Sequence, residues 1–140
     1  MNAARRFEEY AGAVITGASS GLGEAIVKKI RELKGNFPIM SISRSEPRLH
    51  YPEYSLKHVS CDLSNAGSII SCFPAVKDFV EGLDEDGKLL LINNSGIGAY
   101  GEFPEDDFTK LGSMIDLNIR GVVHLTCLLI PSLKTRGGFI

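Results

Sequence analysis

The sequence lacks an excess of charge of either sign and has little cysteine. Its formal net charge is -2, and its basic residues are scattered rather than clustered. This balance excludes a broad electrostatic surface for nucleic acid, so we expect no nucleic-acid partner. The three cysteines, Cys61, Cys72 and Cys127, have no metal-ligand spacing, and the three histidines form no site with them. We therefore expect no metal site and no Ser-His-Asp set.

Long hydrophobic runs are also missing. The first ten residues are polar and lack the apolar core of a secretory signal peptide. The longest apolar stretch, residues 121–133, contains His124 and Pro131 and is too short to span a bilayer. We therefore expect no membrane segment. The odd number of cysteines without a secretory signal fits a reducing compartment, so we expect a cytoplasmic location.

The remaining composition is ordinary for a globular protein. The chain has 140 residues, of which 44% are hydrophobic and 23% charged, and no internal repeat or low-complexity segment. This length suffices for one domain with a single core.

The most informative stretch is the glycine-rich segment from Thr16 to Gly23. It contains the pattern Gly-x-x-x-Gly-x-Gly, preceded by the apolar run 13–15 and followed by the amphipathic run 25–33. A strand, a glycine turn and a helix in this order can hold a dinucleotide pyrophosphate, because glycine lets the backbone approach the phosphates and the helix offers unpaired N–H groups. The alternative interpretation is a glycine-rich connection that binds no ligand.

Apolar and amphipathic runs alternate along the rest of the chain. The apolar runs predict strands at about 12–16, 38–42, 56–60 and 89–92, and the amphipathic runs predict helices at about 21–34, 65–83 and 105–134. This alternation predicts an α/β fold, a Rossmann-type doubly wound parallel sheet with strand order 3-2-1-4. Residues 137–140 would form a turn and a stub of a fifth strand beside the fourth.

Three features of the helices carry further expectations. The first helix is expected to bury one stripe, consisting of Leu22, Ile26, Ile30 and Leu33. Pro74 lies inside the second helical region, where we expect a kink or a new helix start. The third helical run is apolar almost all round between Ile115 and Leu133, so it needs cover on more than one side. We therefore expect a homo-oligomer formed through this long helix.

Several motifs in one order make the chain resemble the short-chain dehydrogenase/reductase family. They are the glycine segment 16–23, Cys61-Asp62-Leu63, Asn93-Asn94-Ser95-Gly96, Asn118 with Gly121, and the terminal residues 137–140. The resemblance covers the chain from about residue 12 to 140. It implies an NAD(P)-binding Rossmann domain over residues 1–140, truncated in the fifth strand.

The resemblance also implies roles for individual residues. The pyrophosphate turn would consist of Gly17, Gly21 and Gly23, lined by Ser19, Ser20 and Leu22. Asp62 would accept a hydrogen bond from the adenine amino group, with Leu63 near the ring. The other interpretation of Asp62 is an acid favoured by the dipole at a helix N-terminus. The central sheet and the cofactor ribose would be contacted by Asn93, Asn94, Ser95 and Gly96, where Ser95 replaces the alanine usual in the family.

The resemblance implies an oxidoreductase that transfers hydride between a nicotinamide cofactor and a carbonyl or alcohol substrate. Of the family's catalytic set, only the asparagine is present, as Asn118, which would bend the long helix and hold a water in the proton relay. The serine, tyrosine and lysine would follow Ile140, so we expect the 140-residue chain alone to be inactive. The alternative is a non-catalytic dinucleotide-binding fragment or an incomplete reading frame of such an enzyme.

The end of the second strand indicates the cofactor. NAD-specific members place an acidic residue there to bind the ribose 2′-OH. In this sequence the position, twenty residues after Gly23, is Ser43, and Arg44 follows it. A guanidinium can pair with a 2′-phosphate, so we expect NADP(H) to be preferred over NAD(H). The alternative is that Arg44 is an exposed loop residue without a ligand.

Overall fold

Four parallel strands form the centre of the molecule. The computed structural model of the chain describes residues 7–52, 55–99 and 108–140. The strands are hydrogen-bonded in the order β3-β2-β1-β4, as the sequence predicted, and they are β1 (Tyr10–Thr16), β2 (Ile39–Ser43), β3 (Leu56–Ser60) and β4 (Lys88–Ile92). The doubly wound parallel α/β fold is therefore confirmed, and the predicted strand positions differ from the observed ones by at most two residues.

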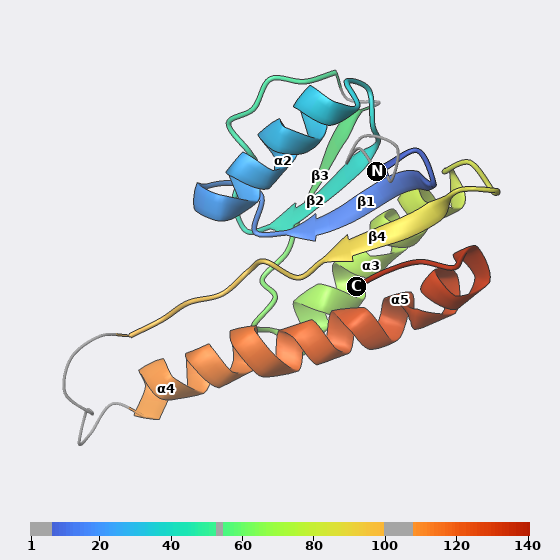
Figure 1. Cartoon of the computed structure of the whole chain (residues 1–140). Coiled ribbons are helices and arrows are strands. Elements are labelled where there is room, and N and C mark those ends of the chain that lie inside the picture. Colours follow the sequence, from blue (N-terminus) through green and yellow to red (C-terminus); the bar gives the residue numbers. More distant parts are fainter. Residues whose placement is uncertain (1–6, 53–54, 100–107) are drawn as a thin grey trace.

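Helices cover both faces of the sheet. Helix α2 (Gly21–Leu33) lies on one face, while α3 (Ala66–Glu81) and α5 (Val122–Arg136) lie on the other (Figure 1). Helix α5 continues a longer run made of α4 (Phe108–Ile115) and the π-helical turn η1 (Asp116–Gly121). The predicted start of this run at residue 105 lies outside the described residues.

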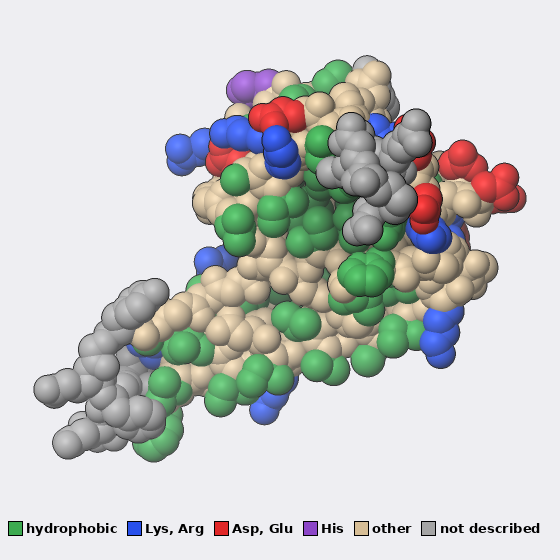
Figure 2. Space-filling model, viewed as in Figure 1, with side chains coloured by type: hydrophobic (Ala, Val, Ile, Leu, Met, Phe, Trp, Pro, Cys, Tyr) green, Lys and Arg blue, Asp and Glu red, His purple; other side chains and the backbone are tan. Residues whose placement is uncertain are grey.

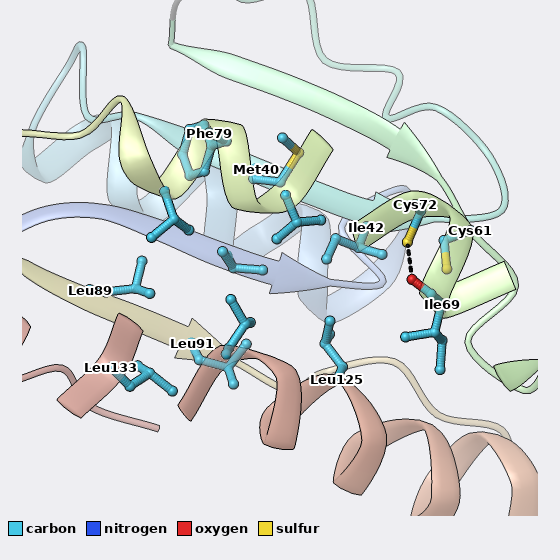
Figure 3. Close-up of a cluster of buried hydrophobic side chains, with 14 of the residues drawn as sticks. Met40, Ile42, Cys61, Ile69, Cys72, Phe79, Leu89, Leu91, Leu125 and Leu133 are labelled. Carbon is cyan, nitrogen blue, oxygen red and sulfur yellow. Dashed lines mark hydrogen bonds between the residues drawn. The ribbon is translucent and has the colours of Figure 1, made fainter. Parts of the chain in front are cut away.

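Alternate residues of each strand supply two separate cores. In β1, Val14 points into the core shared with α3 and α5, whereas Ala13 and Ile15 point into the core beneath α2. Figure 3 shows the first core, where Leu89 and Leu91 of β4 meet the leucines of α5. Because successive side chains of a strand point to opposite faces, continuous apolar runs are what a sheet covered on both sides requires.

The last residues of the chain lie beside β4. Phe139 forms a parallel bridge with Leu90; its N–H donates to the carbonyl of Leu89 at 2.9 Å, and its carbonyl accepts from the N–H of Leu91 at 2.9 Å. The expected place of a fifth strand is therefore confirmed, although the pairing extends over a single bridge.

The buried stripe predicted for the first helix is partly wrong. Leu22 is 71% exposed, and the buried positions of α2 are Gly23, Val27, Ile30 and Arg31. Arg31 is buried because its guanidinium donates to the backbone carbonyls of Gly35 and Phe37, at 2.9 and 2.6 Å, and of Ser55. These bonds give the two terminal guanidinium nitrogens acceptors away from water and tie α2 to the chain on both sides of β2. Leu22 is exposed because it borders the cleft described below.

Of the two outcomes expected at Pro74, a new helix start is wrong, because α3 continues through the proline. A proline at this position leaves the carbonyl of Ile70 without its helical N–H donor. Ile70 is 60% exposed and Pro74 is exposed as well, so water can reach this part of the helix. The lost hydrogen bond therefore lies where it is least costly.

The helical run from Phe108 to Arg136 is long and apolar enough to cross a membrane by length and composition, although the apolar stretch 121–133 considered alone is too short. Core helices of globular proteins pass the same test. Leu125, Leu129 and Leu133 of α5 are buried against the sheet, although only 17% of the apolar window of this helical run is buried.

Candidate functional site

An open cleft of about 820 Å³ lies at the carboxyl ends of the parallel strands. This is where open α/β sheets bind their ligands. Most of the predicted cofactor residues line it, namely Gly17, Ser19, Ser20, Leu22, Ser43, Arg44, Asp62, Leu63, Asn94, Ser95 and Gly96. Gly21, Gly23, Asn93 and Asn118 lie around the cleft without lining it.

The glycine turn leads from β1 into α2. Gly17 and Gly21 have φ angles of 71° and 58°, in a backbone region that residues other than glycine rarely adopt. Gly23 is required for a different reason: a Cβ there would lie 2.1 Å from the carbonyl oxygen of Gly17. Ser20 precedes α2 without a capping side-chain hydrogen bond, so its hydroxyl does not compete for the N–H groups at the helix start. Those N–H groups, together with the helix dipole, suit an anion.

Thr16 joins the glycine turn to the segment after β4. Its hydroxyl oxygen accepts the N–H groups of Asn94 and Ser95, both at 2.9 Å. In return, the Asn94 amide donates to the carbonyls of Thr16 and Gly17, at 3.0 and 3.1 Å. These four hydrogen bonds hold the glycine turn directly against the segment that follows β4.

Asn93 and Asn118 do not line the cleft, but their side chains are hydrogen-bonded to residues beside it or in its wall. The Asn93 amide donates to the hydroxyl of Thr126 on α5 at 3.2 Å, which ties β4 to that helix. Asn118 lies in the π-helical turn η1, and its side chain pairs with the backbone of Ile97: Oδ1 accepts the N–H at 3.0 Å, and Nδ2 donates to the carbonyl at 2.8 Å. The irregular turn agrees with the expected bend of the long helix at Asn118. Gly121, at the end of η1, allows a close approach to Leu63, because a Cβ there would lie 2.2 Å from the Leu63 carbonyl oxygen.

Asp62 follows β3 and lines the cleft. Its Oδ1 accepts the hydroxyl and the N–H of Ser64, at 2.7 and 3.0 Å. These hydrogen bonds, followed by the positive charge of Arg44, lower the pKa of the Asp62 carboxyl. The N-cap of α3 is Asn65, whose side chain accepts the N–H of Ser68. Asp62 is therefore not the cap of that helix, and its carboxylate stays ionised and exposed at the cleft.

Ser43 and Arg44 stand where β2 ends. Ser43 is buried and its hydroxyl donates to the carbonyl of Ser45 at 2.8 Å, so it shapes the turn with its side chain. The side chain of Arg44 is exposed, while its carbonyl accepts the hydroxyl of Ser60 at 3.2 Å. The two ends of β2 and β3 are thereby joined beside Asp62.

Sequence reasoning missed several residues of the cleft. They are Ser45, Cys61, Ser64, Ile97, Ser113 and Leu117. Four of them adjoin a predicted cofactor residue in the sequence, and Leu117 adjoins Asn118, which is a signal that could have included these five. Ser113, like Leu117, comes from the long helix, and only the tertiary structure brings it to the cleft.

Comparison with known proteins agrees with the motifs. The sequence model of the family described as short chain dehydrogenase matches residues 11–140. An uncharacterized oxidoreductase of Staphylococcus epidermidis is 32% identical over 133 residues, which cover 91% of this chain and 55% of that protein. The chain spans about half the length of the curated relatives it matches.

Solved structures show the same likeness. The L-sorbose reductase of Gluconobacter frateurii, solved with NADPH and L-sorbose, is 27% identical with a TM-score of 0.73, covering 93% of this chain and 50% of that one. A 4-hydroxyisoleucine dehydrogenase solved with NADH and succinate is also 27% identical, with a TM-score of 0.67, covering 85% and 50%. Fold, motifs and the match over residues 11–140 lead to one conclusion: the chain belongs to the short-chain dehydrogenase family of NAD(P)-dependent oxidoreductases.

Proposed function

We propose that this chain binds NADP(H) in preference to NAD(H), as the cofactor-binding part of an enzyme that interconverts a carbonyl and an alcohol. The observation that carries the proposal is the cleft in which the glycine turn, Arg44 and Asp62 come together. When bound, the nicotinamide cofactor supplies or accepts the hydride. The protein residues bind and orient it.

The residues of the cleft fit a dinucleotide. Because Gly17 and Gly21 have no side chains, the turn leaves room for a pyrophosphate at the start of α2. The Asp62 carboxylate, kept ionised by its bonds to Ser64, suits an amino group such as that of adenine. Arg44 stands on the same side of the cleft as Asp62, where the ribose of the adenosine half would lie.

The preference for NADP(H) rests on charge at the end of β2. Ser43 is neutral and its hydroxyl is bonded within the turn, so it offers no repulsion to a 2′-phosphate. The exposed Arg44 guanidinium can pair with that phosphate, and such a charged hydrogen bond contributes about 1.5–3 kcal/mol. Family members that bind NADPH and members that bind NADH both resemble this chain, so Arg44 is the feature that favours one cofactor.

A pair of arginine variants tests this choice. We expect Arg44→Ala to weaken NADPH binding by roughly 10- to 100-fold and to change NADH binding little, measured by calorimetric titration. Arg48→Ala is the matched control, because Arg48 is also exposed but does not line the cleft. Equal weakening of both cofactors, or tighter NADH binding by the unmodified chain, would overturn the proposed preference.

We further propose that the 140-residue chain binds the cofactor without turning over substrate. The sequence contains no Tyr-x-x-x-Lys, and a positioned proton donor typically contributes ~10²–10⁴-fold to the rate. Asn118 does not replace it, because both polar atoms of its side chain are bonded to Ile97. Translation of the coding sequence beyond Ile140 distinguishes the front of an enzyme from a binding module: a serine-bearing strand and a Tyr-x-x-x-Lys indicate the enzyme.

A second copy of the chain is the partner we propose for the long helix. Hydrophobic side chains follow its outer side (Figure 2), and those of Phe108, Ile115, Ile119 and Val123 are 76%, 48%, 57% and 57% exposed. Residues 115, 119 and 123 repeat at helical spacing, so they share one face. Exposed apolar faces of this kind mark interfaces.

We also propose a cytoplasmic location. The free thiols of all three cysteines fit a reducing compartment.

A further inference from the structure

Two buried cysteines adjoin the adenine end of the cleft. Cys61 follows β3, is 2% exposed and lines the cleft directly before Asp62; Cys72 lies in α3 and is 7% exposed. Figure 3 shows the two sulfur atoms side by side at the edge of the core. Both thiols are free. The pair therefore consists of one sulfur at the wall of the cleft and one behind it.

The surroundings of the two sulfurs differ. The adjacent Cys72 thiol and the Ser68 hydroxyl, which donates to the Cys61 sulfur at 3.6 Å, lower the pKa of Cys61. The proximity of Cys61, together with burial, raises the pKa of Cys72. The Cys72 thiol donates its single hydrogen to the carbonyl of Ile69 at 3.3 Å (Figure 3). Cys61 is thus the sulfur that loses its proton first, and Cys72 is the neighbouring thiol that keeps it.

We propose that Cys61 and Cys72 form an oxidisable dithiol whose disulfide, made by hydrogen peroxide, weakens dinucleotide binding in the adjoining cleft. The Cys61 thiolate attacks one peroxide oxygen, which yields a sulfenic acid and, after proton uptake, water. The Cys72 sulfur then displaces the sulfenic hydroxyl, and the Cys72 proton leaves with it as a second water. Two thiols lose two electrons, and one peroxide becomes two waters.

The disulfide acts on the cleft through Asp62 and Ser68. Its sulfurs must approach to ~2.05 Å, which draws Cys61 toward α3. Ser68 is hydrogen-bonded to Cys61 and to Asp62: its hydroxyl donates to the Cys61 sulfur and accepts a hydrogen bond from the N–H of Asp62 at 2.9 Å. Moving Cys61 therefore moves the backbone that carries Asp62 and Leu63. This second half of the inference depends on the proposed dinucleotide binding, whereas disulfide formation does not.

Peptide mapping of the whole chain tests the disulfide. The chain is treated with hydrogen peroxide, the remaining thiols are alkylated, and the digest is analysed by mass spectrometry. We expect a cross-linked peptide pair containing Cys61 and Cys72, absent after dithiothreitol. Cys127 is the internal control: it is exposed on α5, so oxidation that followed exposure alone would modify it first. Alkylated Cys61 and Cys72 beside an oxidised Cys127 would overturn the inference.

Titration with NADPH tests the coupling to the cleft. Oxidation of the Cys127→Ser chain is expected to weaken NADPH binding by roughly 10- to 100-fold, the loss of one charged hydrogen bond, and dithiothreitol is expected to restore it. By linkage, bound NADPH should slow disulfide formation. Cys72→Ser cannot form the disulfide, so its NADPH affinity should survive peroxide. A disulfide that leaves the affinity unchanged refutes the coupling; a reduced chain that binds no dinucleotide refutes the proposed function instead and leaves the mapping result unaffected.

Discussion

Replacement of Thr16 by valine is the most direct test of how the cleft is held together. Valine has nearly the shape of threonine, so the buried volume at this 2% exposed position is preserved. The change removes the one oxygen that accepts the N–H groups of both Asn94 and Ser95. A buried donor left without an acceptor costs about 1–3 kcal/mol. Asn94 and Ser95 are half-buried, so we place each loss near the lower end of that range.

The two losses together predict a decrease of roughly 2–4 kcal/mol in the free energy of unfolding. For a domain of this size, that corresponds to a decrease of about 6–12 °C in Tm. Thr16→Ser is the matched control: it keeps the oxygen and removes one methyl group, for a cost of about 1 kcal/mol. Urea and thermal unfolding followed by circular dichroism measure both variants.

The comparison of these variants can refute the reasoning. If valine and serine destabilise the chain equally, the Thr16 hydroxyl does not hold the segment after β4. The same variants report on the cleft, because Ser95 and Gly96 line it. NADPH affinity, measured at a temperature where both variants are folded, is expected to fall for valine and to be retained for serine.

Three further predictions concern the glycine turn, the half-buried His58 and the isolated chain. Gly21→Val and Gly23→Val are both expected to abolish dinucleotide binding in calorimetric titrations, and unchanged affinity in either variant contradicts a phosphate site here. Gly23→Val should destabilise the fold more, because a Cβ at Gly23 would lie 2.1 Å from the backbone, whereas a Cβ at Gly21 would meet open space. Burial lowers the pKa of His58, with Glu46 opposing it, so the stability of the neutral form is present above pH 6.5 and lost as pH falls through the folded-state pKa. His58→Gln should therefore flatten the pH dependence of urea unfolding between about pH 7 and 5, while exposed His50→Gln keeps it, and an unaltered slope in the first variant argues against this assignment. The 140-residue chain is expected to self-associate in size-exclusion chromatography, and the Ile119→Lys variant is expected to self-associate less. The chain is also expected to consume no NADPH with a panel of ketones and aldehydes. A monomer that reduces a ketone would disprove both expectations.

The sequence by itself determined where the strands and helices lie and which glycine turn borders the cleft. Apolar runs such as 89–92 are bounded by turn residues, and these signals are local, so they can be read without knowing the neighbours. The alternation of strand and helix then restricts the topology, because right-handed crossovers leave few ways to order four parallel strands. The glycine turn is predictable for the same reason: positive φ angles at Gly17 and Gly21 are a property of the turn itself.

The tertiary structure decided which side chains are buried, bonded or free. Helical periodicity alone assigned Leu22 to the core, which was wrong, and its predicted stripe did not include Arg31, which is buried. The burial of Arg31 depends on the carbonyl of Ser55, far along the chain, which no local pattern encodes. Pro74 could remain inside a helix because that side of α3 faces water.

The details of the cleft depend on contacts between segments that are distant in the sequence. Thr16 meets Asn94, Asn118 meets Ile97, and Cys61 meets Cys72 only after the strands have aligned. A motif specifies the residue types at the end of each strand, but hydrogen bonds between strand ends require the register and the packing of the whole sheet. Local propensity therefore determines the elements and the glycine turn. The partners of each polar group follow from three-dimensional packing, because a donor and its acceptor must meet within about 3 Å.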